Sequence, residues 1–140
     1  MAYIDTSVLV AYYCPESLSA SVQKKLTKIE QPVISPLVEV EMCSAVAAKV
    51  RDRQLDTAAA KRILAQFQKH LADGSYGIVP IDTAEYGLAR DWISGFSSTL
   101  RAPDALHLAT AFTNDLTLLT ADKALAQSAK QFRVRYELLS

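Results

Sequence analysis

The sequence predicts an α/β protein with three layers, in which helices cover both faces of a central, mainly parallel sheet. Short apolar runs alternate along the chain with longer segments of helical periodicity, which is the pattern of strands joined by helical crossovers. Some of these connections hold two helices in succession. The 140 residues are 50% hydrophobic and 21% charged, as in an ordinary globular protein, and we expect one domain over residues 1–140.

Five segments are predicted to be strands, because each is a short apolar or β-branched run bounded by residues that favour turns. The segments are residues 2–4, 31–35, 76–81, 116–119 and 132–138. The first of them ends at Asp5, directly after its apolar part. The last could extend the sheet or pair with a second chain.

The helices of the first half of the chain are marked by residues that favour helix starts. Thr6 and Ser7 turn the chain from the first strand into a helix, which Pro15 breaks. Residues 17–29 have apolar side chains at helical spacing and lysines outside them, so they are predicted to form an amphipathic helix. A serine cap and a proline then start a helix over residues 37–53.

The second half of the chain carries similar signals. An aspartate–threonine pair opens a helix over residues 57–72, and Asp82 and Glu85 have the spacing of a capping box at the start of the next helix. Helices over residues 104–113 and 123–130 each begin directly after a proline or an aspartate.

The helix predicted over residues 37–53 is unusually apolar. It has almost no polar face, so we expect it to be buried on several sides. Glu41 shares a face with apolar side chains, whereas Glu39 projects from a different side. A buried carboxylate costs several kcal/mol unless it is paired or binds a metal. The basic residues of this helix lie too far along it to pair with Glu41, so a group from elsewhere must neutralise the carboxylate, and a divalent cation could.

Composition and charge argue against several classes of protein. The chain has 15 basic and 15 acidic residues, which argues against nucleic-acid binding through overall charge but not against a local basic groove. No apolar run approaches the roughly 18 residues of a membrane span, and no leader sequence is recognisable. Cys14 and Cys43 lie far apart in apolar surroundings, and we expect both to be buried in a reducing compartment. We therefore expect a cytoplasmic protein without a membrane partner.

Four acids are predicted to gather at one edge of the sheet, where parallel strands end and helices begin. They are Asp5, Glu41, Asp104 and Asp122. Asp5 and Asp122 each follow a strand, Asp104 lies in the first turn of its helix, and Glu41 lies in the first half of its helix. The three aspartates could instead cap or favour helix N-termini. Glu41 has no such structural explanation.

Carboxylates of this kind suit Mg²⁺ or Mn²⁺ better than zinc, and neither His70 nor His107 has the spacing of a zinc ligand. Several carboxylates around one or two such ions activate water and stabilise charge in phosphodiester cleavage. We interpret His107 as a buried histidine with satisfied hydrogen bonds, not as a ligand. Three hydroxyl residues are expected to orient the carboxylates: Thr6, Ser7 and Thr120.

The four segments that carry these acids resemble, in order, the motifs of PIN-domain ribonucleases. They are Tyr3-Ile-Asp5-Thr-Ser7, Ile34-Ser-Pro-Leu-x-x-x-Glu41, Leu100-Arg-Ala-Pro-Asp104-Ala-Leu-His-Leu-Ala109 and Leu119-Thr-Ala-Asp122. The chain is most similar to the VapC toxins of bacterial type II toxin–antitoxin pairs, and the resemblance extends from residue 3 to about residue 125. Each motif alone is unspecific, but four in the family's order and spacing are specific.

This resemblance implies a PIN-like fold and metal-dependent endonucleolytic cleavage of RNA. It implies that the four acids form the catalytic site and hold Mg²⁺ or Mn²⁺, which positions a water for attack on the phosphodiester. It also implies a homodimer and a cognate antitoxin that carries a DNA-binding part. Arg101 and Lys123 each lie beside a proposed ligand, and we expect them to contact RNA phosphates. The apolar helix and the helix pair after it are a candidate surface for a second copy or the antitoxin.

Three other interpretations fit part of the sequence. A haloacid-dehalogenase-type phosphohydrolase would need a second aspartate at the position of Ser7, and a phosphoacceptor receiver domain would need its acid at Asp82, which is better explained as a helix cap. The chain could also be a catalytically inactive PIN-fold binding module. A nuclease that processes RNA without being a toxin is the remaining alternative, although the small size without an added domain favours the toxin.

Overall fold

The computed structural model describes residues 1–140 and contains a five-stranded sheet with seven helices around it. The strands are β1 (Ala2–Ile4), β2 (Pro32–Ile34), β3 (Gly77–Ile78), β4 (Thr117–Thr120) and β5 (Tyr136–Leu138). All neighbouring strands are parallel, in the order β3-β2-β1-β4-β5. The predicted three-layer α/β/α class is therefore confirmed, and the last strand extends the sheet by pairing with β4.

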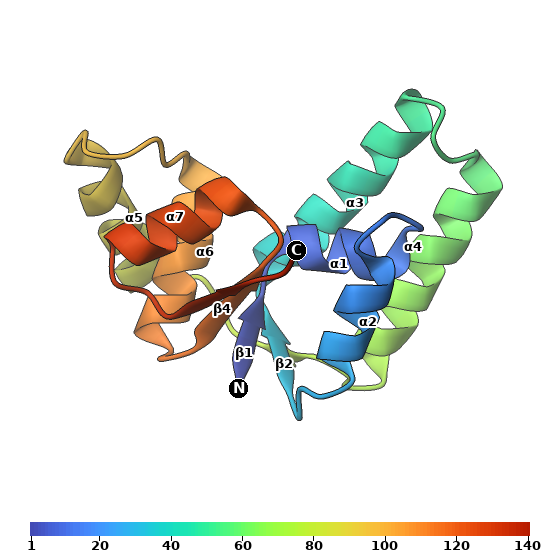
Figure 1. Ribbon diagram of the computed structural model, residues 1–140, viewed down its shortest axis with the longest axis horizontal. Helices are drawn as coiled ribbons and strands as arrows, with labels where there is room; N and C mark the ends of the chain where they lie inside the picture. Colours follow the sequence, from blue (N-terminus) through green and yellow to red (C-terminus); the bar gives the residue numbers. More distant parts are fainter.

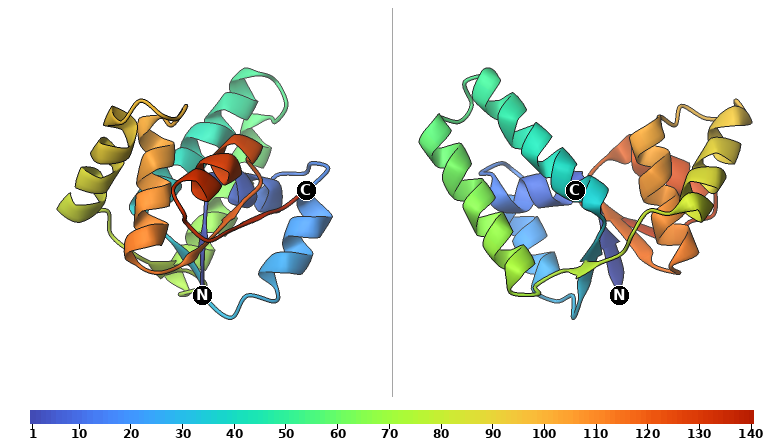
Figure 2. Two further views of the ribbon diagram at one scale, coloured as in Figure 1. Left: turned by 60° about the vertical axis from the view of Figure 1, so that its left-hand side comes forward. Right: turned by 180° about the vertical axis from the view of Figure 1, so that it is seen from behind.

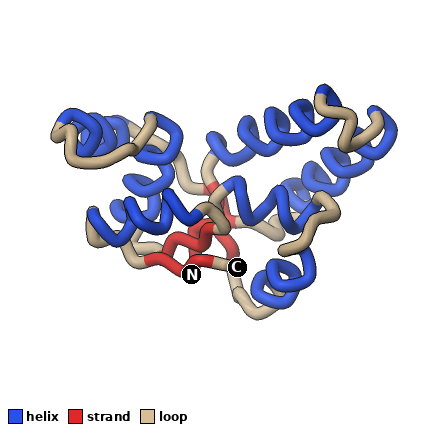
Figure 3. The backbone as a smooth tube through the Cα atoms, turned by 45° about the horizontal axis from the view of Figure 1, so that its top comes forward, coloured by secondary structure: helices blue, strands red, loops and turns tan.

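Helices α1–α4 lie on one side of the sheet and α5–α7 on the other (Figure 1). They are α1 (Thr6–Tyr13), α2 (Ser19–Leu26), α3 (Pro36–Arg51), α4 (Thr57–Ala72), α5 (Thr83–Ser94), α6 (Ala102–Thr113) and α7 (Lys123–Gln131). Figure 2 shows α3 and α4 as one antiparallel pair and α5 and α6 as another. Figure 3 shows the strands enclosed between the two groups of helices. None of the seven helices is both long and apolar enough to cross a membrane.

The strand order places β1 at the centre of the sheet, beside β4, although the two strands are far apart in the sequence. From β1 the chain builds outward through β2 to β3, and it then crosses to β4 and β5 on the other side. The strand order therefore reverses between β1 and β4, where the backbone N–H of Asp5 donates to the carbonyl of Leu119 at 3.2 Å. Ligands of open parallel sheets bind outside the carboxyl ends of the strands at such a point.

The central strands are buried on both faces, as the apolar runs predicted. Tyr3 and Ile4 of β1 and Leu118 and Leu119 of β4 belong to one hydrophobic cluster of 29 buried residues. Because this cluster holds β1 and β4 rigidly, the residues that follow these two strands start from fixed positions.

Two predicted strands are shorter than expected. The segment over residues 76–81 forms a strand only at Gly77–Ile78, because Pro80 has no N–H to continue the ladder. The segment over residues 132–138 is a strand only from Tyr136, because α7 extends to Gln131 and the chain then turns through Arg133, which has a φ of 58°. The helix predicted over residues 17–29 is also shorter, because α2 extends only over Ser19–Leu26.

The expectation that the apolar helix is buried on several sides is wrong. Helix α3 buries one face only, and its outer face exposes Val40 and Cys43, with 68% of Val40 accessible. Cys43 is therefore not the buried cysteine that was expected, whereas Cys14 is buried. The buried side chains of α3 are Val38, Met42 and Val46. The helix packs against α1 and α4. These contacts cover only part of its apolar surface, and the remaining apolar side chains are exposed.

The predicted capping box at the start of α5 is confirmed. The buried carboxylate of Glu85 accepts a hydrogen bond from the backbone N–H of Asp82 at 3.1 Å. Replacing Glu85 by alanine leaves that N–H without its partner, and we expect a loss of about 1 kcal/mol in the free energy of unfolding. Urea denaturation would measure the loss. Glu85→Gln keeps an acceptor oxygen and should lose less, and an equal loss in both variants would contradict this explanation.

Candidate active site

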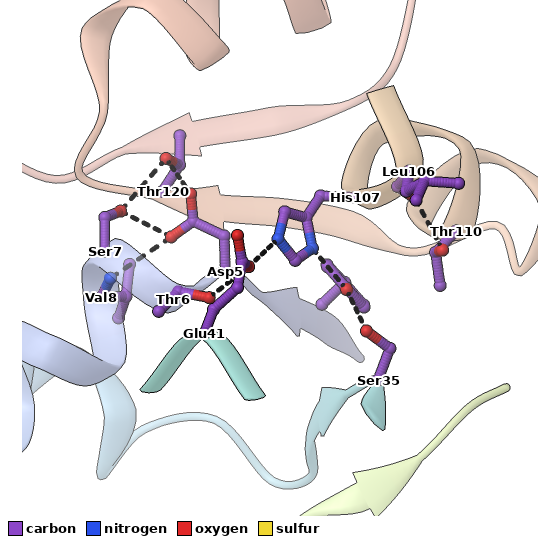
Figure 4. Close-up of polar contacts among 11 residues, drawn as sticks. Asp5, Thr6, Ser7, Val8, Ser35, Glu41, Leu106, His107, Thr110 and Thr120 are labelled. Atoms are coloured by element: carbon purple, nitrogen blue, oxygen red, sulfur yellow. Dashed lines mark hydrogen bonds and ion pairs between the residues drawn. The ribbon is translucent and has the colours of Figure 1, made fainter. Parts of the chain in front are cut away.

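Asp5 lies at the carboxyl end of β1 and caps α1, and only 3% of it is exposed. Its Oδ1 accepts hydrogen bonds from the hydroxyl of Ser7 at 2.6 Å and the backbone N–H of Val8 at 3.2 Å. Its Oδ2 accepts from the hydroxyl of Thr120 at 2.6 Å (Figure 4). Burial raises the pKa of Asp5, and these donors oppose the rise. Asp5 is thus a cap, but one whose two oxygens are both held in place.

Two of the predicted orienting hydroxyls also connect β1 to the loop after β4. The Thr120 hydroxyl accepts from the backbone N–H of Asp122 at 3.0 Å, and the Ser7 hydroxyl accepts from the backbone N–H of Ala121 at 2.9 Å. Asp122 itself is exposed and accepts from two backbone N–H groups at the start of α7. The interpretation of Asp122 as a helix cap therefore describes its protein contacts correctly.

Glu41 extends from α3 toward the end of β1 and is partly buried. Its Oε1 accepts two hydrogen bonds, from the Thr6 hydroxyl at 2.7 Å and from Nε2 of His107 at 2.5 Å. Its Oε2 has no hydrogen-bond partner in the protein. Burial acts to raise the pKa of Glu41, but the contacts with His107 and Thr6 outweigh burial and leave the pKa below its usual value. His107 is thus the group from elsewhere that the sequence required.

His107 was predicted to be buried and hydrogen-bonded, and it is 2% exposed with both ring nitrogens engaged. The sequence analysis did not include it among the site residues. Two signals point to it: it lies three residues after Asp104, on the same face of α6, and Glu41 had no partner in its own helix.

Asp104 lies in the first turn of α6 and is partly buried, and its side chain forms no hydrogen bond within the protein. Burial raises its pKa, the negative charge of Asp122 raises it further, and Glu41 and Asp5 add to the effect, whereas His107 opposes it. The other three acids are therefore close enough to act on Asp104 electrostatically. Asp5 and Asp122 each accept hydrogen bonds from backbone N–H groups at a helix start, whereas the side chain of Asp104 does not.

The donor chemistry of this site fits a hard divalent cation. Both oxygens of Asp104 and Oε2 of Glu41 lack protein donors, and carboxylate oxygens are the ligands that Mg²⁺ and Mn²⁺ prefer. A cation would relieve the repulsion that raises the pKa of Asp104. No three acidic, histidine or cysteine side chains lie close enough to share an ion as they stand, so binding would have to draw the acids together.

Arg101 and Lys123 lie at the starts of α6 and α7, beside Asp104 and Asp122 in the fold. Both are exposed, and neither forms an ion pair. They are the only basic residues next to the acids in sequence, and both are accessible to an anion.

The raised pKa of Asp104 predicts how the stability of the metal-free protein depends on pH. The folded protein keeps a proton on Asp104 where the unfolded chain, with its ordinary pKa of 3.8, has lost it. This contribution to stability is fully present below 3.8 and is lost as the pH rises through the raised pKa. Urea denaturation in EDTA at acidic to neutral pH should show a shallower decline for Asp104→Asn. Glu41, whose lowered pKa acts in the opposite direction, is common to both proteins, so parallel curves would contradict the prediction.

Comparisons with known proteins show similarity to one family model and to several solved structures. The family model described as PIN domain matches residues 2–131. FitAcB from Neisseria gonorrhoeae has a similar structure. The match covers 97% of this chain and 96% of the FitAcB chain, with 22% identity and a TM-score of 0.72. VapBC2 from Rickettsia felis, bound to a DNA fragment from its promoter, is similar over 100% of both chains, with 16% identity and a TM-score of 0.69.

A third solved structure is VapC20 from Mycobacterium tuberculosis, described as a toxin that cleaves the sarcin–ricin loop. The match covers 91% of this chain and 95% of the VapC20 chain, with 14% identity and a TM-score of 0.72. These identities show a shared fold. A search of curated proteins found no match.

Proposed function

Because this chain belongs to the PIN domain family, we propose that it is a metal-dependent endoribonuclease and the toxin of a toxin–antitoxin pair. The observation that supports the proposal is that four acids come from four segments and that three of them act electrostatically on the fourth. One of them, Asp104, is partly buried, has no protein donor and is repelled by the other three. A fold that needed these acids only as caps would leave none of them in that state.

Asp5, Glu41, Asp104 and Asp122 would hold Mg²⁺ or Mn²⁺, which when bound supplies a polarised water and neutralises charge on the cleaved phosphodiester. Ser7 and Thr120 hold both oxygens of Asp5, so this carboxylate is fixed before the ion binds. Thr6 fixes Oε1 of Glu41 in the same way. Arg101 and Lys123 would contact phosphates on either side of the acids.

The toxin assignment is supported by solved structures of similar fold, two of which are described as a toxin–antitoxin complex and as a member of the VapBC family of toxin–antitoxin systems. The outer face of α3 is a candidate surface for such a partner. It exposes Val40, Cys43 and Ala47, and exposed apolar side chains that lie together are typical of a protein interface. A cognate antitoxin, or a second copy of the chain, would cover it. A toxin that acts on RNA would work in the cytoplasm.

Cleavage of RNA in defined metal conditions tests the enzymatic part of the proposal. We expect the purified protein to cut a pool of structured RNAs at internal positions with Mn²⁺ or Mg²⁺, and not in EDTA. Asp56 is a matched control, since it caps α4 and is exposed; Asp56→Asn should cleave at the wild-type rate. Metal-dependent cleavage of no RNA, or equal cleavage in EDTA, would reject the proposal and favour the binding module.

Induced expression in bacteria separates a toxin from a nuclease that processes RNA. A toxin should arrest growth, and co-expression of its cognate antitoxin should restore growth. Normal growth despite metal-dependent cleavage in vitro would favour the processing enzyme.

A further inference from the structure

A chain of hydrogen bonds runs from the buried end of β2 to the acids. The hydroxyl of Ser35 lies 2.7 Å from the hydroxyl of Tyr3, which lies 2.7 Å from Nδ1 of His107. Nε2 of His107 lies 2.5 Å from Oε1 of Glu41, which also accepts from Thr6. Figure 4 shows the imidazole between the carboxylate and the core. Of these residues, Ser35, Tyr3 and His107 have no role in the mechanism described above.

Stability alone gives no reason to bury these hydrogen-bonded polar groups. Ser35 and Tyr3 are completely buried and His107 is almost so, and burial of polar groups is unfavourable unless each finds a partner. Replacing all partners of such a set by apolar groups of similar shape is close to neutral for stability. A polar connection at this place therefore points to a requirement beyond packing.

The Glu41 carboxylate at the end of this series of hydrogen bonds determines which atom of each pair donates. An ionised carboxylate only accepts hydrogen bonds, so Nε2 of His107 must carry a proton. In the neutral ring Nδ1 then accepts from Tyr3, and the Tyr3 oxygen accepts from Ser35. This arrangement satisfies every member, and the contacts at both ring nitrogens hold the imidazole in place.

The contact also joins the two sides of the fold. Glu41 lies on α3 on one side of the sheet, and His107 lies on α6 on the other. Asp104 precedes His107 by three residues on the same face of α6. The bond between His107 and Glu41 therefore constrains the position of Asp104 relative to Glu41 as well as the rotamer of Glu41.

We propose that His107, held by Tyr3 and Ser35, is a positioning residue that anchors Oε1 of Glu41 and leaves Oε2 for the cation. The proposal rests on the proposed metal-dependent function. It assigns a task to a histidine that binds neither metal nor RNA.

Mn²⁺ binding measured by calorimetry on the full chain tests the proposal without any assumption about the RNA. Loss of an orienting partner typically weakens metal binding by about 10- to 100-fold, and we expect that loss in His107→Ala. The amide nitrogen of Gln can replace Nε2 as the donor, so His107→Gln should recover part of the affinity. Tyr3→Phe keeps the ring and removes the hydroxyl that holds His107, and it should show an intermediate loss.

Tyr13→Phe is a matched control, because the same chemistry occurs away from the acids. The Tyr13 hydroxyl lies 2.7 Å from Nδ1 of His70 and 2.7 Å from the Tyr76 hydroxyl. Its removal should lower the melting temperature, as Tyr3→Phe is also expected to do, but should leave the Mn²⁺ affinity unchanged. A purely structural role for Tyr3 would make the two variants behave alike in both measurements.

The outcomes separate this inference from the function on which it rests. If the wild type and Asp104→Asn differ in Mn²⁺ binding but His107→Gln and Tyr3→Phe bind as the wild type does, the positioning role is overturned and the nuclease proposal stands. If His107→Ala does not fold, His107→Gln and Tyr3→Phe still test the positioning role. If the wild type shows no saturable Mn²⁺ binding, both proposals are overturned.

Discussion

Replacing Asp104 by asparagine is expected to slow RNA cleavage strongly while making the protein more stable. The carboxylate is partly buried, has no hydrogen-bond donor and is repelled by Asp122, Glu41 and Asp5. Removing its charge should raise the free energy of unfolding by about 0.5–2 kcal/mol, the usual gain when a strained functional group is neutralised. Loss of one preorganised electrostatic contact should lower the cleavage rate by about 10²–10³-fold.

The opposite signs of these two effects make the prediction specific. Cleavage rates in Mn²⁺ and urea denaturation in EDTA would be measured on the same preparations. Asp115→Asn is a suitable control, because Asp115 is an exposed acid whose side chain contacts only Arg135. It should change neither quantity appreciably. An Asp104→Asn variant that is less stable than the wild type, or that cleaves RNA as fast, would contradict the electrostatic account of the site.

Replacing Asp5 by alanine is expected to inactivate the protein and also to destabilise it. The substitution removes the cap of α1 and leaves the Val8 N–H and the hydroxyls of Ser7 and Thr120 without their acceptor. A lost cap costs about 1 kcal/mol, and buried donors without partners cost about 1–3 kcal/mol more. We therefore expect the free energy of unfolding to fall by on the order of 3 kcal/mol.

Asp56→Ala provides the comparison for Asp5→Ala. Asp56 also caps a helix, through one bond of 2.7 Å to the backbone N–H of Ala59, but it is exposed and binds no other group. Its removal should cost only about 1 kcal/mol. Equal losses in the two variants, measured by urea denaturation, would mean that Asp5 acts as a cap alone and that its hydroxyl contacts contribute little.

The alternation of strands and helices and the starts of several helices were predictable because their signals are local. The end of β1 at Asp5, the cap of α4 and the capping box of α5 are each encoded within a few neighbouring residues. The burial of α3 was not predictable from composition, since an apolar sequence does not specify which face meets the core. Val40 lies on the exposed face and Met42 on the buried one, and only packing against α1 and α4 decides between them.

The grouping of the four acids is a prediction from the sequence, because parallel strands place their carboxyl ends at one edge. The partner of Glu41 could not, because His107 is 66 residues away and their contact depends on how α3 and α6 approach each other. The sequence did show that Glu41 needed a partner. What it could not show is that a protein side chain occupies Oε1, which leaves Oε2 and Asp104 as the unpaired oxygens.

Mn²⁺ binding to the wild type and to Asp104→Asn, measured by calorimetry without RNA, tests most directly whether the acids form one metal site. The account predicts saturable binding to the wild type that is lost in the variant, because Asp104 supplies two of the unpaired carboxylate oxygens. Indistinguishable weak binding to both proteins would contradict it. The acids would then be helix caps and hydrogen-bond acceptors, and the chain would be a PIN-fold binding module.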